Sequence, residues 1–269
     1  MNLGIILIFA ALASPAPLPS PSAAPVADAC GGATTNLLAT LNRPTIGFSA
    51  CAVKPRESLW ELGYFNQIQN DGSHAAVYPQ GFIRFGASPR LEWDVVGPNY
   101  LVQKGGGILQ RGFLDGGVGA KCEFFSSPSD TAALDLLYIF PTGSALFTAG
   151  APVETLNFDY GHALSPVAGV ATTIGVQSSF AQTLAGRASR FTSLLPSIAF
   201  TIQSNPRTQF YAEWYGQTRI RPDGGTLLGV NGGVQYMLRP DLEIDTELGQ
   251  TVTDLARGHY FGFGIGVRP

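Results

Sequence analysis

Residues 242–250 read LEIDTELGQ, and residues 259–268 read HYFGFGIGVR. In both stretches, apolar side chains alternate with polar or very small ones. Successive side chains of a β-strand point to opposite faces, so the alternation predicts two strands that are apolar on one face only. Strands of about ten residues with this pattern are typical of membrane-spanning β-barrels, which face lipid outside and a lumen inside.

The same alternation recurs through residues 57–269 and marks twelve segments. They are residues 57–70, 74–86, 90–96, 112–125, 132–140, 155–164, 167–180, 191–203, 208–219, 227–238, 242–250 and 259–268. The connections after every second segment are short and mostly contain proline, which ends strand pairing. Longer, glycine-rich connections are expected at residues 97–111, 141–154 and 181–190. Outer-membrane barrels divide periplasmic turns from extracellular loops in this way, so we predict an all-β, transmembrane antiparallel β-barrel of twelve strands over residues 57–269.

The composition agrees with a protein that lies in a membrane. Charged residues make up 13% of the chain, against roughly a quarter in an average soluble domain. Hydrophobic residues make up 45%, which is too many for a disordered chain. The 16 Lys and Arg do not exceed the 19 Asp and Glu, so nucleic acid is not an expected partner. The expected partners are the lipids of the bacterial outer membrane, which is the expected location.

Residues 1–29 are interpreted as a secretory signal peptide. Residues 3–13 (LGIILIFAALA) form an apolar run that is too short to cross a bilayer, and a stretch rich in Pro, Ala and Ser follows. Residues 27–29 (ADA) then offer a cleavage site. Residues 30–56 precede the first predicted strand, and we expect them either to hang in the periplasm or to enter the lumen as a plug.

The cysteines bear on that N-terminal segment. Cys30 and Cys51 can close a loop of about 20 residues, and an exported protein permits disulfides. We therefore expect these two residues to form a disulfide, with lipidation of Cys30 as the alternative and Cys122 as a free thiol. No Cys or His has the spacing of metal ligands, so no metal and no other cofactor is expected.

A resemblance to a known family rests on several stretches. Residues 205–218 (NPRTQFYAEWYGQT), 232–250 (GGVQYMLRPDLEIDTELGQ) and 259–267 (HYFGFGIGV) resemble the last four strands of the outer-membrane transporter family of the meta-pathway of phenol degradation. Residues 147–176 resemble the middle of that family, and residues 36–55 (NLLATLNRPTIGFSACAVKP) resemble an N-terminal segment of some members. The resemblance implies a barrel for passive uptake of small solutes, aromatic or hydrophobic compounds among them.

The last residues depart from the usual pattern of outer-membrane barrels. Such barrels commonly end in an aromatic residue that the barrel-insertion machinery recognises, and that machinery is an expected partner. This chain ends Val267-Arg268-Pro269. Proline cannot donate a backbone hydrogen bond to the last strand pair.

The phase of the segments turns most charged side chains toward the lumen. The predicted inward acids are Glu61, Glu92, Asp94, Asp115, Glu123, Asp135, Asp159, Glu213, Glu243, Asp245 and Glu247. The predicted inward bases are Arg84, Arg90, Lys121 and Arg219, and the predicted inward tyrosines are Tyr78, Tyr211 and Tyr215. The aromatic residues expected to face outward are Trp60, Trp93, Trp214, Tyr64 and Tyr236.

Two hypotheses follow from this inward charge. Carboxylates that line a pore favour cations, so the lumen is either a path for cations and polar solutes, with tyrosines contacting aromatic ones, or a packed interior in which each charge has a partner. Two other classes of function stay open. A structural or adhesive barrel would bind a partner through long loops. An outer-membrane lipid hydrolase would need a Ser and a His in contact, but His162 and Ser165 are three residues apart and point to opposite faces of a strand, so no catalytic residues are expected.

Overall fold

The structure is a computed structural model that describes residues 30, 32, 34–253 and 257–269. The predicted signal peptide, residues 1–29, lies outside the described residues. The elements in the described part of the chain are α1 (Leu37–Thr40), β1 (Ser58–Gln69), β2 (His74–Tyr78), β3 (Phe82–Ser88), β4 (Leu91–Val96), β5 (Tyr100–Gly105), β6 (Ile108–Phe113), β7 (Gly117–Ser126), β8 (Asp130–Ile139), β9 (Val153–Ser165), β10 (Ala168–Gln182), β11 (Ala188–Asn205), β12 (Thr208–Gln217), β13 (Leu227–Arg239), β14 (Leu242–Thr251) and β15 (Gly258–Val267). Among these residues no helix is long and apolar enough to cross a membrane.

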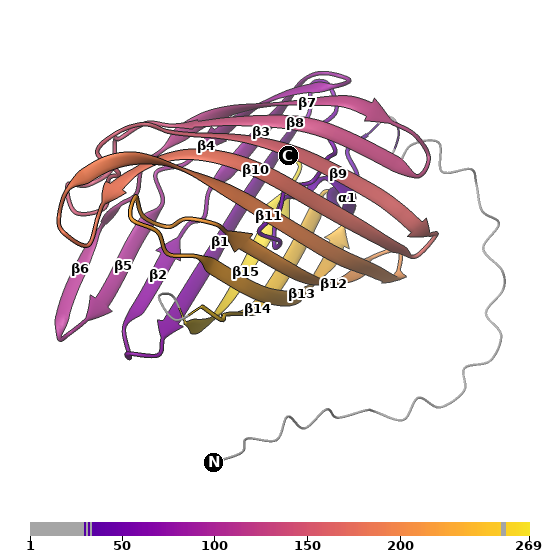
Figure 1. Ribbon diagram of the computed structural model, residues 1–269. Coiled ribbons are helices and arrows are strands. Elements are labelled where there is room, and N and C mark those ends of the chain that lie inside the picture. Colours follow the sequence, from indigo (N-terminus) through magenta and orange to yellow (C-terminus); the bar gives the residue numbers. More distant parts are fainter. Residues whose placement is uncertain (1–29, 31, 33, 254–256) are drawn as a thin grey trace, which may run out of the picture.

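The strands form one closed antiparallel barrel (Figure 1). Closure is made by β15, which pairs with β1 from Trp60 opposite Val267 to Gln69 opposite Gly258. Within the described residues the fifteen segments form twelve strands, because three strands are each interrupted once. The predicted fold class and strand number are therefore confirmed. Closure pairs the backbone groups that an open sheet edge would leave unsatisfied in lipid.

The three interrupted strands are neighbours in the sheet. β2 and β3 are two halves of one strand, as are β4 and β5, and β6 and β7. β1 accordingly pairs with β3 through residues 58–61 and with β2 through residues 65–68. The break at residues 79–81 shifts the alternation by one residue, so Tyr78 stacks on the outward-facing Tyr64, with ring centroids 6.2 Å apart. The prediction that Tyr78 faces the lumen is therefore wrong.

Two connections that were predicted to be long loops are mostly strand. Residues 97–111 contain β5 and part of β6, which form a hairpin closed by Gly106 and Gly107 at φ 55° and 79°. A positive φ suits glycine, so the three consecutive glycines mark a tight turn. Residues 181–190 contain the end of β10 and the start of β11, which leaves residues 183–187 as the connection. These strand ends are rich in small and polar residues, whose alternation is too weak to recognise in the sequence.

The outer and inner faces of the barrel differ as the alternation predicts. Large apolar side chains point outward and are exposed on the bare protein, among them Trp60, Trp93 and Trp214 with exposed fractions of 42%, 56% and 41%. Most buried side chains of the inner face are polar or charged. An apolar exterior around a polar interior is the arrangement of a barrel that lies in lipid.

Residues 34–56, called the inner segment below, run inside the barrel and include α1 (Figure 1). The predicted disulfide between Cys30 and Cys51 is present and is therefore confirmed, and Cys122 is an exposed free thiol. A small apolar cluster joins Leu37 and Val53 of this part of the chain to Leu59 at the start of β1. The segment thus occupies the lumen and does not hang from the end of the barrel.

Candidate functional site

Most of the residues predicted to face the lumen are buried inside the barrel. The buried ones are Glu61, Arg84, Glu92, Asp94, Lys121, Glu123, Asp135, Asp159, Tyr211, Glu213, Tyr215, Glu243, Asp245 and Glu247. They come from β1, β3, β4, β7, β8, β9, β12 and β14. The structure therefore gathers side chains that are up to 186 positions apart in the sequence around the inner segment.

The remaining predicted inward residues lie near the ends of the barrel. Arg90 is exposed in the turn before β4, and Arg219 is exposed beyond the end of β12. Asp115 lies between β6 and β7 and accepts hydrogen bonds from the backbone N–H groups of Gly143 and Ala149, at 2.7 and 2.8 Å. Asp115 therefore holds the connection between β8 and β9, and this connection closes part of the loop end of the barrel.

A second loop contact joins two neighbouring connections at the same end. The carboxylate of Asp223 accepts a hydrogen bond from the backbone N–H of Leu184 at 2.8 Å. This bond to the charged form lowers the pKa of Asp223 below its ordinary value. The contact is therefore present at neutral pH and is lost as the pH falls through that lowered pKa.

Two basic side chains hold the inner segment by its carbonyl oxygens. Arg84 on β3 donates to the carbonyl of Cys51 at 2.9 Å and to the carbonyl of Thr40. Lys121 on β7 donates to the carbonyl of Ser49 at 2.7 Å. Both bases also meet the carboxylate of Glu92, at 2.8 and 3.7 Å. Each base is thus shared between the wall and the segment.

Carboxylates on the same strands hold the segment by its N–H groups. Glu61 on β1 accepts from the backbone of Asn42 and Arg43, at 3.0 and 2.9 Å. Glu92 on β4 accepts from Val53 at 2.6 Å. Glu123 on β7 accepts from Ala52 at 3.0 Å. An irregular chain buried inside a barrel needs partners for its backbone groups, and these acids supply them.

The tip of the inner segment, residues 45–48, is held in the same way from other strands. Glu213 on β12 accepts from the N–H groups of Ile46 and Gly47, at 2.8 and 2.7 Å. The Oγ of Thr173 on β10 accepts from the N–H of Phe48 at 2.9 Å. Arg43 forms a salt bridge with Asp245 on β14 at 3.0 Å. These contacts fix where the segment lies in the lumen.

The acidic surplus of the interior is thus largely used to bind the inner segment. Ten carboxylates among the described residues are buried, whereas the buried bases of the strands are Arg84 and Lys121. Sequence reasoning located these acids but did not identify their partners, because backbone N–H groups of an irregular segment leave no pattern. The one available signal was the number of inward acids, which exceeded the inward bases.

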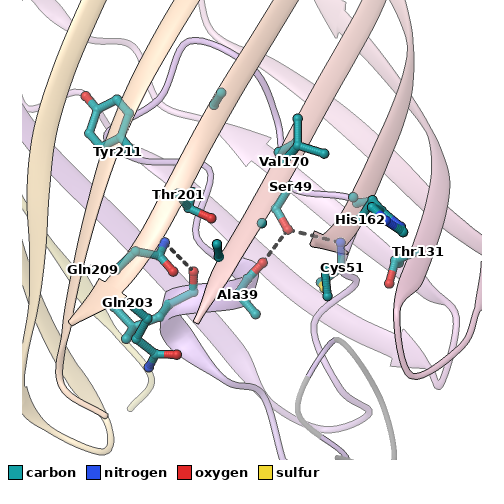
Figure 2. A pocket seen from close by; sticks show the side chains of 18 of the residues that line it. Ala39, Ser49, Cys51, Thr131, His162, Val170, Thr201, Gln203, Gln209 and Tyr211 are labelled. Carbon is teal, nitrogen blue, oxygen red and sulfur yellow. Dashed lines mark hydrogen bonds between the residues drawn. The ribbon is translucent and has the colours of Figure 1, made fainter. Parts of the chain in front are cut away.

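The largest cavity in the described structure lies between the inner segment and the wall at the short-turn end, and has a volume of about 660 Å³. Figure 2 shows Ser49 and Cys51 of the segment and Thr201, Gln209 and Tyr211 of the wall around it. The wall here carries small side chains, which leave the space open. These small residues, called the hollow side below, are Gly161, Ala163, Gly169, Ala171 and Ala199 of β9, β10 and β11.

A second cavity of about 260 Å³ lies on the loop side of the segment tip. Its lining includes Ile46, Thr173, Ser197 and Tyr215. Of the described residues, no Asp or Glu lines either cavity, and the second has no Lys or Arg in its lining. Arg43, which borders the first cavity, is bound to Asp245 and Gln80. Both spaces are therefore uncharged, although the interior around them is rich in charge.

The His and Ser that were weighed as a hydrolase pair have other partners. His162 Nδ1 lies 2.8 Å from Asp130 Oδ1, and the Oγ of Ser165 accepts from the N–H of Ala168 at 3.0 Å in the turn before β10. Among the described residues, no three His, Cys, Asp or Glu side chains come together as a metal site. The geometry that the structure offers is therefore a set of cavities around a bound segment.

No family model and no curated protein matches the chain. Solved structures do: an outer-membrane channel from Pseudomonas putida F1 has a TM-score of 0.62 at 11% identity, covering 82% of this chain and 98% of that one. The NanC porin has a TM-score of 0.55 at 12% identity, covering 79% and 100%. The translocator domain of the autotransporter NalP from Neisseria meningitidis has 0.54 at 9%, covering 79% and 88%. At these identities the similarity shows the fold alone, that of bacterial outer-membrane β-barrels.

Proposed function

We propose that the protein is an outer-membrane channel for the passive uptake of small uncharged solutes, in which the inner segment narrows the lumen to one path. The observation that carries the proposal is the pair of uncharged cavities, one on each side of the segment tip. Porin-type channels take up solutes through a polar lumen, whereas a barrel that served only as a scaffold would have no need for such spaces. The apolar exterior supports location in a lipid bilayer.

The path follows the hollow side. A solute that enters from the loop end meets the cavity bordered by Ser197 and Tyr215. It leaves through the larger cavity, where Gly161 and Ala163 keep the wall away from the inner segment. The carboxylates of β1, β4 and β7 are turned to the segment and do not line this path, so they do not select cations along it.

Aromatic or hydrophobic solutes suit this path. Phe48, Tyr211 and Tyr215 present aromatic rings to the cavities, while Thr201 and Gln203 offer hydrogen-bonding groups beside them. The resemblance of residues 36–55, 147–176 and 205–267 to the phenol meta-pathway transporters supports the same solute class. We therefore include phenol-like compounds among the solutes that this channel admits.

Swelling of liposomes that contain the refolded protein tests the proposal. Glucose, gluconate and glucosamine have similar sizes and differ in charge, so their rates compare an uncharged solute with an anion and a cation. We expect glucose to enter fastest, and phenol to reduce the entry of glucose. Faster entry of glucosamine would mean that the acids govern the path, and a lack of swelling with all three sugars would contradict the channel.

A further inference from the structure

The two cavities are separated at one point of the inner segment. Phe48 is the residue that borders both of them in the described structure. Ala171 borders the larger cavity, and Thr173, two residues further along β10, borders the smaller one. A solute that moves from one cavity to the other along β10 therefore passes Phe48.

The segment and the wall approach each other closely at this level. A Cβ atom placed on Gly47 would lie 2.1 Å from the Oγ of Ser197 on β11, so only glycine fits there. The N–H of Phe48 is bound to Thr173 on the neighbouring strand, and Thr173 donates in turn to Asp159 at 2.7 Å. Backbone atoms of the segment are therefore fixed against β10 and β11.

The ring of Phe48 is held less tightly than its backbone. Its nearest aromatic neighbour is Phe82, with ring centroids 6.0 Å apart, and the Nζ of Lys121 lies 5.7 Å from its centroid. These are soft contacts, each worth about 0.5–1.5 kcal/mol. A change of side-chain rotamer moves the ring without breaking the backbone bonds that fix the segment.

We propose that Phe48 sets the size of solute that this channel admits, with Thr173 as the residue that positions it. This inference rests on the proposed function, since it names the narrowest point of the proposed path. The ring closes the passage between the cavities and opens it by turning aside. The uncharged surroundings mean that size and apolar contact, and not charge, decide passage at this point.

The experiment compares rates of liposome swelling with glucose, maltose and maltotriose, an uncharged series of rising size. We expect Phe48→Ala to raise the maltotriose-to-glucose ratio several-fold, and Phe48→Trp to lower it. Thr173→Val is expected to raise the ratio by a smaller factor, whereas Thr173→Ser, which keeps the hydroxyl, restores it. Ile46→Ala is the matched control, because Ile46 lies in the same tip and borders the smaller cavity alone among the two.

Failure of this inference can be told from failure of the proposed function. If the wild type swells with glucose but the ratio is the same in Phe48→Ala and Phe48→Trp, Phe48 does not set the size limit. If the wild type does not swell at all, the channel function fails; entry of glucose through Phe48→Ala would then still identify Phe48 as the obstruction, and no entry would overturn both ideas. Heat-modifiable gel mobility checks that every variant is a folded barrel.

Discussion

The two sides of the lumen are built from different residue types. On the side called packed below, which comprises β1, β3, β4 and β7, Glu61, Arg84, Glu92 and Lys121 reach across to the inner segment and are almost fully buried. On the hollow side, small residues of β9, β10 and β11 leave a cavity of about 660 Å³. The difference teaches that long charged side chains anchor the segment, and that the path lies where those side chains are missing. The predictions below are attempts to break this contrast.

The largest effect is expected from removing the base at the centre of the packed side. Arg84→Met leaves Glu61 and Glu92 buried without their main cation and frees the carbonyls of Thr40 and Cys51. Loss of one partner of a buried ion pair costs about 3–5 kcal/mol. Urea unfolding of the refolded barrel, followed by tryptophan fluorescence, measures the loss. Arg90→Met, in an exposed turn, is the control, and equal losses in both variants would contradict the anchoring role.

The next effect concerns the covalent anchor of the inner segment. Cys30→Ser with Cys51→Ser opens a loop whose ends are 21 residues apart. The chain-entropy account gives a loss of about 3 kcal/mol in the free energy of unfolding. We also expect the segment to leave the lumen more often, which planar-bilayer recordings would show as openings of larger conductance. Cys122→Ser should change neither quantity, and steady wild-type currents in the double variant would rule out that part.

A smaller effect compares two glycines on opposite sides of the lumen. A Cβ on Gly86 of β3 would lie 1.9 Å from the carbonyl oxygen of Lys54, whereas a Cβ on Gly161 of β9 meets no atom within 4 Å. Gly86→Ala therefore forces the segment to move and is expected to cost about 1–3 kcal/mol. Gly161→Ala is expected to stay within about 0.5 kcal/mol of the wild type. Similar losses in the same urea titration would mean that the hollow side is packed in solution.

The barrel wall was predictable from the sequence because alternation is a local signal. β14 and β15 show it in its strictest form, and their pairing follows from the closure of a barrel. The signal failed where a strand is interrupted, as at residues 79–81, where the shift by one residue turns Tyr78 outward. It also failed where small residues replace apolar ones, as in β5 and at the ends of β10 and β11.

The candidate site was predictable only in part. The inward positions of the buried acids follow from strand phase, but what they bind does not, because Glu61, Glu123 and Glu213 accept from backbone groups of an aperiodic segment. Phe48 carried no signal either, since its importance comes from meeting Thr173, which is 125 positions away. Contacts of this kind depend on where a chain without periodicity comes to rest.

The central claim is that solutes pass between the inner segment and the hollow side. Its most direct test is the rate of glucose entry into liposomes that contain Gly161→Leu, which fills the open space on β9 without touching the anchors. We predict a several-fold fall in that rate with unchanged stability, while Ala212→Leu on the outer face of β12, which adds the same bulk, leaves it unchanged. A wild-type rate in Gly161→Leu would contradict the claim.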